Sequence, residues 1–481
     1  MDQPQSLIDR TVANLRRMWR EAAGILPQRG SARLGPDLEE ADAELVRERM
    51  RACLEARGGE VSARARAADL GAIYLALSPI GRRRFLEILA RDFDVDRAAL
   101  KETAARYVAS GDAKEAIRLE GTLRAALTAP RRRLLTQFNA LAQGVKFLVD
   151  LRAELLGLAR GGALDSDLAG LDRDLRELLE SWFDVGFLDL RRITWRSPAA
   201  LLEKLIAYEA VHRIRSWTDL RNRLDADRRC YGFFHPRMPD EPLIFVQVAL
   251  LRGLAGRIQP LLDEQQPLGD PQTADTAIFY SITNAQEGLR GIGFGAFLLK
   301  QVVDDLAREL PHLKAFATLS PIPGFRRWLD SLPADAVTGM VGARDAALLA
   351  EFAAPGGDWR ALLEDESWPE SEPVADALHE PLLRLSAHYL LEAKRGNAPL
   401  DPVARFHLNN GAAIERLNWL GDISPKGLAE SAGLMVNYRY RLEDIEANHE
   451  AYSSHGDIAA ADAVRELAGS VEQGWRIPLL D

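Results

Sequence analysis

The chain has 481 residues, of which 47% are hydrophobic and 27% charged, a balance that excludes a disordered or low-complexity protein. Its formal net charge is -10 at pH 7, so nucleic acid and membrane surfaces, which are densely anionic, are not expected as partners. The two cysteines, Cys53 and Cys230, are far apart in the sequence. This usage predicts a reducing compartment, the cytoplasm, without a disulfide framework.

No membrane span is expected either. The longest nearly apolar run, Leu243–Leu251, has about half of the roughly 18 to 20 residues that a helix needs to cross a bilayer. The N-terminal segment has acidic residues and no apolar core, so it does not read as a secretory signal.

The first third of the chain predicts a bundle of helices. Apolar residues at helical spacing mark the stretch 79–94, where they are Phe85, Ile88, Leu89 and Phe93. Further helices are expected after Pro36 and over 113–128 and 130–158, with Pro130 in a first turn. We predict about eight helices over residues 4–182, with a structural or oligomeric role because no catalytic spacing occurs there.

The second part, after Trp182, predicts a sheet domain. Strands are expected at 229–234, 243–251, 276–282 and 315–319, with an amphipathic helix over 297–310 before the last of them. Other helices are expected over 197–213, 381–394 and 402–420, the last capped by Asp401, and a surface excursion over 355–373. This order of elements indicates an α/β or α+β fold.

A glycine-rich segment follows the strand at 276–282 and precedes the amphipathic helix. Its residues are Arg290, Gly291, Ile292, Gly293, Phe294, Gly295 and Ala296. Glycines let the backbone approach a ligand, and the amides of an opening helix turn attract anions, so the segment predicts a phosphate seat.

Three ligand-binding motifs are possible interpretations of this segment, besides a glycine turn that only lets the helix and strand pack. A dinucleotide fold lacks the acidic residue about 20 positions later, since none lies between Glu309 and Asp330. A Walker A loop lacks its Gly-Lys-Ser/Thr. The pattern R-x-x-G-x-G over Arg290–Gly295 resembles the coenzyme A pyrophosphate loop of the GNAT acyltransferase superfamily.

Three later segments carry a more specific resemblance. They are Thr318–Leu329 (TLSPIPGFRRWL), Ala404–Ala412 (ARFHLNNGA) and Asn437–Tyr440 (NYRY). Together they resemble the malonyl-CoA decarboxylase family over most of residues 190–445. The resemblance implies an α+β protein, with an all-α helical oligomerisation domain over 1–182 and a GNAT-like α/β catalytic domain with a mixed central sheet over 183–481.

The same resemblance implies an activity and partners. Malonyl-CoA would be converted to acetyl-CoA and CO2 without metal or organic cofactor, since the coenzyme A moiety is part of the substrate. A homo-oligomer, dimer or tetramer, is expected through the helical domain.

Two residues are the candidate catalytic pair. Ser320 precedes Pro321, which favours extended backbone, and His407 lies on the first turns of a capped helix with a side-chain pKa suited to proton transfer near neutrality. Taken alone, the serine also fits a turn or cap and the histidine a satisfied core residue. The resemblance implies that they are the family's catalytic serine and histidine: Ser320 orients the malonyl carboxylate, and His407 as general acid protonates the enolate carbon.

Supporting residues are less constrained. Asn410 and Tyr440 donate to the thioester oxygen or brace His407, with a structural hydrogen bond left open for either. Gly293 stands where the family often carries an acidic residue, which puts in doubt any mechanism that needs a carboxylate there.

Other chemistries have weaker support. The remaining histidines form no HExxH motif or His/Cys cluster, so a metal is not expected. No serine lies in a G-x-S-x-G elbow, which argues against an α/β-hydrolase. A GNAT-type acyltransferase acting on an amine, and a non-catalytic acyl-CoA-binding protein, stay open as alternatives.

Overall fold

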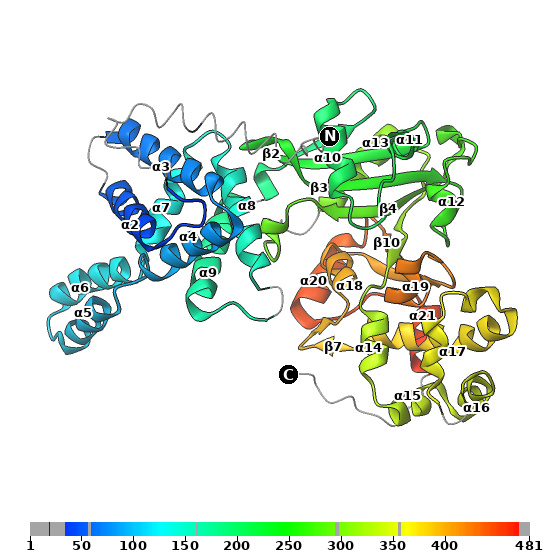
Figure 1. The fold of residues 1–481 in the computed structure, drawn as a ribbon. Helices are drawn as coiled ribbons and strands as arrows, with labels where there is room; N and C mark the ends of the chain where they lie inside the picture. Colours follow the sequence, from blue (N-terminus) through cyan, green and yellow to red (C-terminus); the bar gives the residue numbers. More distant parts are fainter. Residues whose placement is uncertain are drawn as a thin grey trace. The chain divides into compact units, whose positions relative to one another are not determined.

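The computed structural model of the chain describes Trp19 and the residues 34–55, 59–159, 162–183, 185–293, 298–354 and 357–470 (Figure 1). These residues form two compact units. The first takes the described residues up to Leu188 together with two later segments, Phe234–Pro242 and Gln286–Gly293. The second takes the rest of the described chain.

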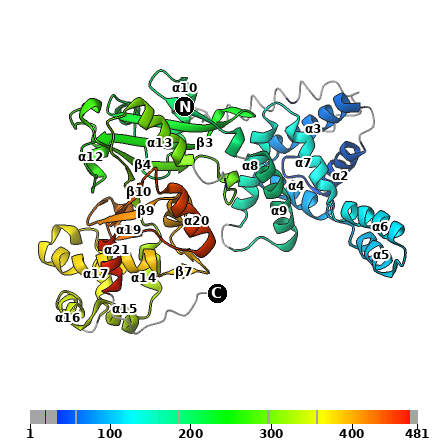
Figure 2. The same cartoon turned by 180° about the vertical axis from the view of Figure 1, so that it is seen from behind.

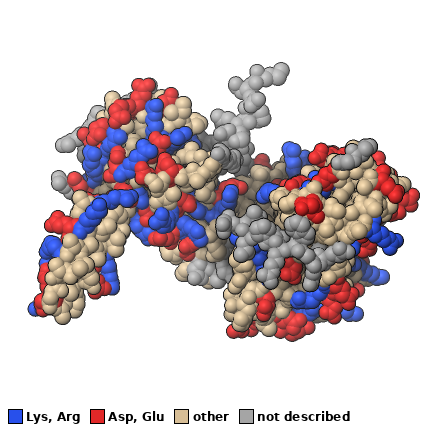
Figure 3. Space-filling model, turned by 90° about the horizontal axis from the view of Figure 1, so that it is seen from below, with Lys and Arg blue, Asp and Glu red and all other residues tan. Residues whose placement is uncertain are grey.

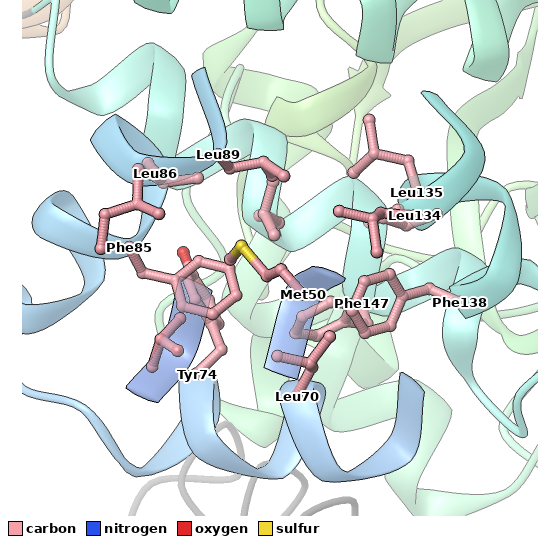
Figure 4. Close-up of a cluster of buried hydrophobic side chains, with 14 of the residues drawn as sticks. Met50, Leu70, Tyr74, Phe85, Leu86, Leu89, Leu134, Leu135, Phe138 and Phe147 are labelled. Carbon is pink, nitrogen blue, oxygen red and sulfur yellow. The ribbon is translucent and has the colours of Figure 1, made fainter. Parts of the chain in front are cut away.

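The first unit is helical, as predicted. Its helices are α2 (Glu40–Leu54), α3 (Gly59–Ala76), α4 (Pro79–Arg91), α5 (Arg97–Ala109), α6 (Ala113–Ala126), α7 (Pro130–Asn139), α8 (Gly144–Gly157) and α9 (Ser166–Trp182). The predicted stripe on α4 is buried, and Ser78 caps this helix by accepting a hydrogen bond from Gly81 N at 3.2 Å. Figure 4 shows residues of α2, α3, α4, α7 and α8 meeting in one apolar core.

The single helix predicted over 130–158 is wrong. The chain turns between α7 and α8, where Gln143 adopts a left-handed φ of 60°. A side chain at Gly144 would meet the carbonyl oxygen of Phe138 at 1.7 Å, so only glycine permits this tight reversal.

Helices α5 and α6 form an arm that projects from the other helices of the first unit in two opposite views (Figures 1 and 2). Helix α5 has no buried residue, and α6 buries only Leu119. Val108 is 83% exposed and Ile117 71%. The arm therefore presents apolar side chains to solvent, between the charges visible in Figure 3.

The second unit is built on a mixed sheet, which confirms the predicted fold class. Within the described residues its strands are β1 (Asp189–Ile193), β2 (Arg228–His235), β3 (Met238–Leu251), β4 (Thr276–Asn284), β5 (Ala315–Thr318), β6 (Ser320–Pro321), β9 (Ala413–Asn418) and β10 (Met435–Tyr440). Their order is β1-β2-β3-β4-β5-β10-β6, and β9 pairs with β10. Strands β4 and β5 are parallel, whereas β3 runs antiparallel to β4, and β10 runs antiparallel to β5, β6 and β9.

Helix α13 (Leu298–Glu309) connects β4 to β5 and lies in front of the strands in Figure 2. Its predicted apolar face is buried, with Leu298, Val302, Val303 and Leu306 each 3% exposed or less. This burial is the usual basis of a parallel crossover.

Further helices and a two-stranded ribbon complete the second unit. They are α10 (Ala199–Tyr208), α11 (Trp217–Asn222), α12 (Gln259–Leu262), α14 (Phe325–Ser331), α15 (Ala334–Val341), α16 (Ala343–Phe352), α17 (Glu372–Leu391), β7 (Lys394–Arg395), β8 (Ala398–Pro399), α18 (Pro402–Asn409), α19 (Pro425–Ser431), α20 (Ile445–His455) and α21 (Asp462–Gly469).

Two predictions in this region need correction. The helix expected over 402–420 ends at Asn409, and its second half is strand β9, because Gly411 takes a φ of +77° and leads the chain onto β10. The segment 355–373 is not a plain surface excursion, since Trp359 and Trp368 are buried in short 3-10 turns.

In the described part of the chain, no helix has the length and apolar content needed to traverse a membrane. Both cysteines are buried free thiols.

Candidate active site

Strand β10 brings two of the candidate residues, Ser320 and Tyr440, into one region, because it pairs with both short strands β5 and β6. Val436 lies opposite Ser320, and Tyr440 lies opposite Phe316. Side chains two positions apart share a face of a strand. Ser320 and Tyr440 are therefore brought to one region by non-local pairing.

Helix α18 brings the histidine. Asp401 caps it, with Oδ1 accepting from Val403 N and Ala404 N at 2.9 Å each, as predicted. The helix is short, so His407 stands in its last turn and not in the first turns of a long helix. The His407 side chain is 2% exposed.

The serine, the histidine and a tyrosine form one chain of hydrogen bonds. Ser320 Oγ lies 3.1 Å from His407 Nε2, and His407 Nδ1 lies 2.7 Å from the hydroxyl of Tyr440. Ser320 Oγ also donates to Thr318 Oγ1 at 2.9 Å. The ring of Tyr438 stacks on the imidazole at 4.4 Å between centroids.

These contacts determine which imidazole nitrogen carries the proton. Ser320 uses its single hydrogen on Thr318, so toward His407 it accepts a hydrogen bond from Nε2–H. Nδ1 of a neutral imidazole is then bare and accepts from Tyr440. The hydrogen-bond network thus assigns the Nε2–H tautomer.

Burial sets the charge of this group. Loss of solvation lowers the pKa of His407 to about 3, so without substrate the imidazole is neutral at pH 7. The expectation of a pKa near neutrality is wrong for the unliganded site. Burial also raises the pKa of Tyr440, which keeps its phenol protonated and able to donate.

Asn410 lies at the end of α18 and is 3% exposed. Its Nδ2 donates to Phe406 O at 2.8 Å, and no described residue is within hydrogen-bonding distance of its Oδ1. It makes no side-chain hydrogen bond to His407 among the described residues. An unpaired buried oxygen of this kind is costly unless a ligand or water meets it.

The described part of the glycine-rich segment, residues 290–293, lies in the first unit, whereas Ser320, His407, Asn410 and Tyr440 lie in the second. Ile292 is buried, Arg290 and Gly293 are exposed, and Gly291 is exposed with a φ of +79° and open space where a side chain would lie. Phe294, Gly295 and Ala296 are outside the described residues.

Two residues of the site were not predicted as such, Thr318 and Tyr438. Thr318 is fully buried and accepts from Ser320 Oγ and from Tyr438 N, at 2.9 and 3.1 Å. The signal was the period of two: Thr318 with Ser320, and Tyr438 with Tyr440, share a strand face. Among the described residues, no group of three or more His, Cys, Asp or Glu side chains is placed to hold a metal ion.

A buried hydroxyl–imidazole–phenol chain is an arrangement that could move protons, as in enzymes that use general acid–base catalysis. Comparison with known proteins gives the family. The profile of the malonyl-CoA decarboxylase C-terminal domain matches residues 186–476, and that of the N-terminal domain matches residues 93–183. The chain belongs to the malonyl-CoA decarboxylase family.

Individual relatives agree with this assignment. The mitochondrial malonyl-CoA decarboxylase of the goose Anser anser anser is 38% identical over 431 residues, which is 86% of this chain and 85% of the relative. The crystal structure of malonyl-CoA decarboxylase from Rhodopseudomonas palustris has a TM-score of 0.80 at 44% identity, covering 88% of this chain and 99% of that one. The structure from Agrobacterium vitis has a TM-score of 0.75 at 43% identity, with the same coverage.

Proposed function

We propose that Ser320 and His407 are the catalytic residues with which this chain decarboxylates malonyl-CoA. The activity itself, a carboxy-lyase reaction that yields acetyl-CoA and CO2, follows from membership of the family. The observation that supports the two roles is the buried 3.1 Å contact between Ser320 Oγ and His407 Nε2.

The chemistry needs two things that these residues supply. When the bond to the carboxylate carbon breaks, its electron pair stays on the α-carbon and spreads onto the thioester oxygen as an enolate. Ser320 orients the departing carboxylate by turning its hydroxyl hydrogen from Thr318 Oγ1 to a carboxylate oxygen. The imidazolium form of His407 then transfers its Nε2 proton to the α-carbon, which leaves a neutral ring, and solvent restores the proton.

Binding of the substrate also raises the low pKa of His407. A carboxylate about 4 Å from the imidazole attracts its charged form by about 4 kcal/mol at an effective dielectric constant of about 20. That attraction raises the pKa by about 3, which brings the imidazolium within reach at neutral pH. The enolate left by CO2 loss keeps the negative charge beside the acid until the proton is transferred.

Tyr440 and Asn410 have supporting roles in this proposal. Tyr440 braces His407 through Nδ1, to which it donates when the ring is neutral and from which it accepts when the ring is charged. It thereby fixes the ring and aims Nε2–H toward Ser320. Asn410 contacts substrate through its unpaired Oδ1, which accepts and cannot donate. This atom suits an N–H of the pantetheine arm better than the thioester oxygen.

The segment Arg290–Ala296 is proposed to hold the pyrophosphate of coenzyme A in the manner of a GNAT loop. Exposed Arg290 and the open backbone at Gly291 support an anion seat. Gly293 supplies no carboxylate, so the proton transfer is assigned to His407 alone. Neither a metal nor an organic cofactor takes part. Membership of the family disfavours the amine acyltransferase and the non-catalytic binding protein.

We also propose that the helical part oligomerises and that the chain works in the reducing cytoplasm. The apolar side chains on the α5–α6 arm, such as Val108 and Ile117, suit contact with a second copy as a dimer or tetramer. The free thiols of Cys53 and Cys230 fit a reducing compartment. Light scattering of V108D and I117D tests the arm, since an unchanged mass would contradict this role.

The catalytic proposal is tested by CO2 release from malonyl-CoA with the chelator-treated enzyme. H407Q should lose about 10²–10⁴-fold in kcat, and S320A should be strongly impaired. S386A and H388Q are matched controls, because each removes a buried or half-buried side chain of the same kind elsewhere in the second unit. Near-wild-type rates in both S320A and H407Q would overturn the assignment.

A further inference from the structure

The proposed phosphate loop is attached to helix α8 by an unusually close backbone approach. The short turn Glu287–Leu289 lies against α8 so tightly that a side chain at Gly288 would meet Val149 O at 1.8 Å. One helical turn further along the same face of α8 stands Arg152. Val149 and Arg152 thus form one surface on which the loop rests.

Arg152 is a buried cation that donates hydrogen bonds to two carbonyl oxygens of the loop. Its side chain is 3% exposed, and Nη1 donates to Gly288 O at 2.7 Å and to Arg290 O at 2.9 Å. Its Nε donates to Asp172 on α9 at 2.8 Å, which neutralises the charge and fixes the guanidinium plane. The Arg152 side chain thereby connects its own helix α8 with helix α9 and with the loop.

This grip has a direct consequence for the amide that faces a ligand. In a trans peptide the C=O and the N–H point in opposite directions. Because Arg290 O is held toward Arg152, the N–H of Gly291 in the same peptide points away from α8. Gly291 is exposed with open space beside it, and no described residue accepts from its N–H.

We propose that Arg152 is a positioning residue that orients the Arg290–Gly291 peptide, so that the Gly291 amide is presented to the pyrophosphate of coenzyme A. Arg152 does not touch the substrate, since its side chain is only 3% exposed and its Nε and Nη1 are used on Asp172 and the loop carbonyls. A lysine cannot reproduce this arrangement, because it offers a point charge without a planar fork. This inference rests on the proposed role of the Arg290–Ala296 loop.

The test compares two substrates that share the malonyl thioester and the pantetheine arm. Malonyl-CoA also carries the 3′-phospho-ADP group, which includes the pyrophosphate, whereas malonyl-pantetheine lacks this whole group. R152M should lower kcat/KM for malonyl-CoA about tenfold or more, mainly through KM, and leave kcat/KM for malonyl-pantetheine within about twofold of wild type. R152K should give an intermediate loss and supplies the same readout if R152M does not fold.

R131M is the matched control. Arg131 is equally buried in the first unit and holds Asp174 and Ala90 O, yet it makes no contact with the loop. Its ratio of kcat/KM values for the two substrates should equal that of wild type. An unchanged ratio in the Arg152 variants, with both substrates affected alike, would overturn the inference. A wild-type enzyme that does not distinguish the two substrates would instead overturn the phosphate role of the loop itself.

Discussion

Replacing Tyr440 with phenylalanine removes one atom from the site and leaves the ring in place. The hydroxyl donates to His407 Nδ1 at 2.7 Å, and both side chains are buried. In Y440F the bare Nδ1 has lost its donor inside the protein. A tautomer with the proton on Nδ1 then becomes competitive, and that tautomer has no proton to direct at Ser320.

The size of the effect follows from the cost of a buried unpaired acceptor, about 1–3 kcal/mol. If the whole cost is felt in the transition state, kcat falls about 5- to 150-fold. The KM for malonyl-CoA should change much less, because Tyr440 acts through His407. The assay is steady-state CO2 release at saturating malonyl-CoA, together with urea unfolding of each variant.

Tyr438 provides the comparison, since it lies on the same face of β10. Its ring stacks on His407, but its hydroxyl has no described partner. Y438F keeps the stacking and loses an unpaired group, so its free energy of unfolding should match or exceed that of wild type. A Y440F enzyme with kcat within twofold of wild type would refute the bracing role of Tyr440.

Three further predictions concern acid stability, loop packing and metals. Since the pKa of His407 falls from 6.5 in the unfolded chain to about 3 in the fold, this residue should cost about 2 kcal/mol of stability at pH 5, so the loss measured by urea unfolding between pH 7 and pH 5 should be smaller by that amount in H407Q. His212, whose pKa burial lowers to about 4, contributes a loss of its own to both proteins. G288A should lose about 1–3 kcal/mol and raise KM, because Val149 O blocks its new methyl group, whereas G293A, with open space, should stay within about 0.5 kcal/mol. Exhaustive treatment with a chelator should leave kcat unchanged, and recovery of lost activity on adding a metal would contradict the metal-free account.

The local elements were largely predictable where the pattern and its boundaries agreed. The stripes on α4 and α13, and the cap by Asp401, needed only neighbouring residues. Strand β9 was mistaken for helix because its apolar residues fit either period over so short a run. What decides its state is pairing with β10, about 20 residues later, together with the turn at Gly411.

The candidate catalytic residues were identifiable from the sequence, whereas their contacts were not. Ser320 and His407 were identified from a family resemblance, while their contact depends on β10 pairing with β6 and on where α18 ends. The low pKa of His407 depends on burial, which no local pattern reveals. The grip of Arg152 on the loop joins residues more than 130 positions apart, and nothing in the sequence near either of them indicates it.

The central claim is that His407 delivers the proton that captures the enolate. The most direct measurement is turnover of malonyl-CoA by H407Q in the presence of ¹³C-labelled bicarbonate and CO2. Without the acid the enolate survives long enough to recapture CO2, so the account predicts a loss of about 10²–10⁴-fold in kcat and label in the remaining malonyl-CoA, with none in the wild-type reaction. An H407Q enzyme that works within threefold of the wild-type rate and incorporates no label would contradict the account.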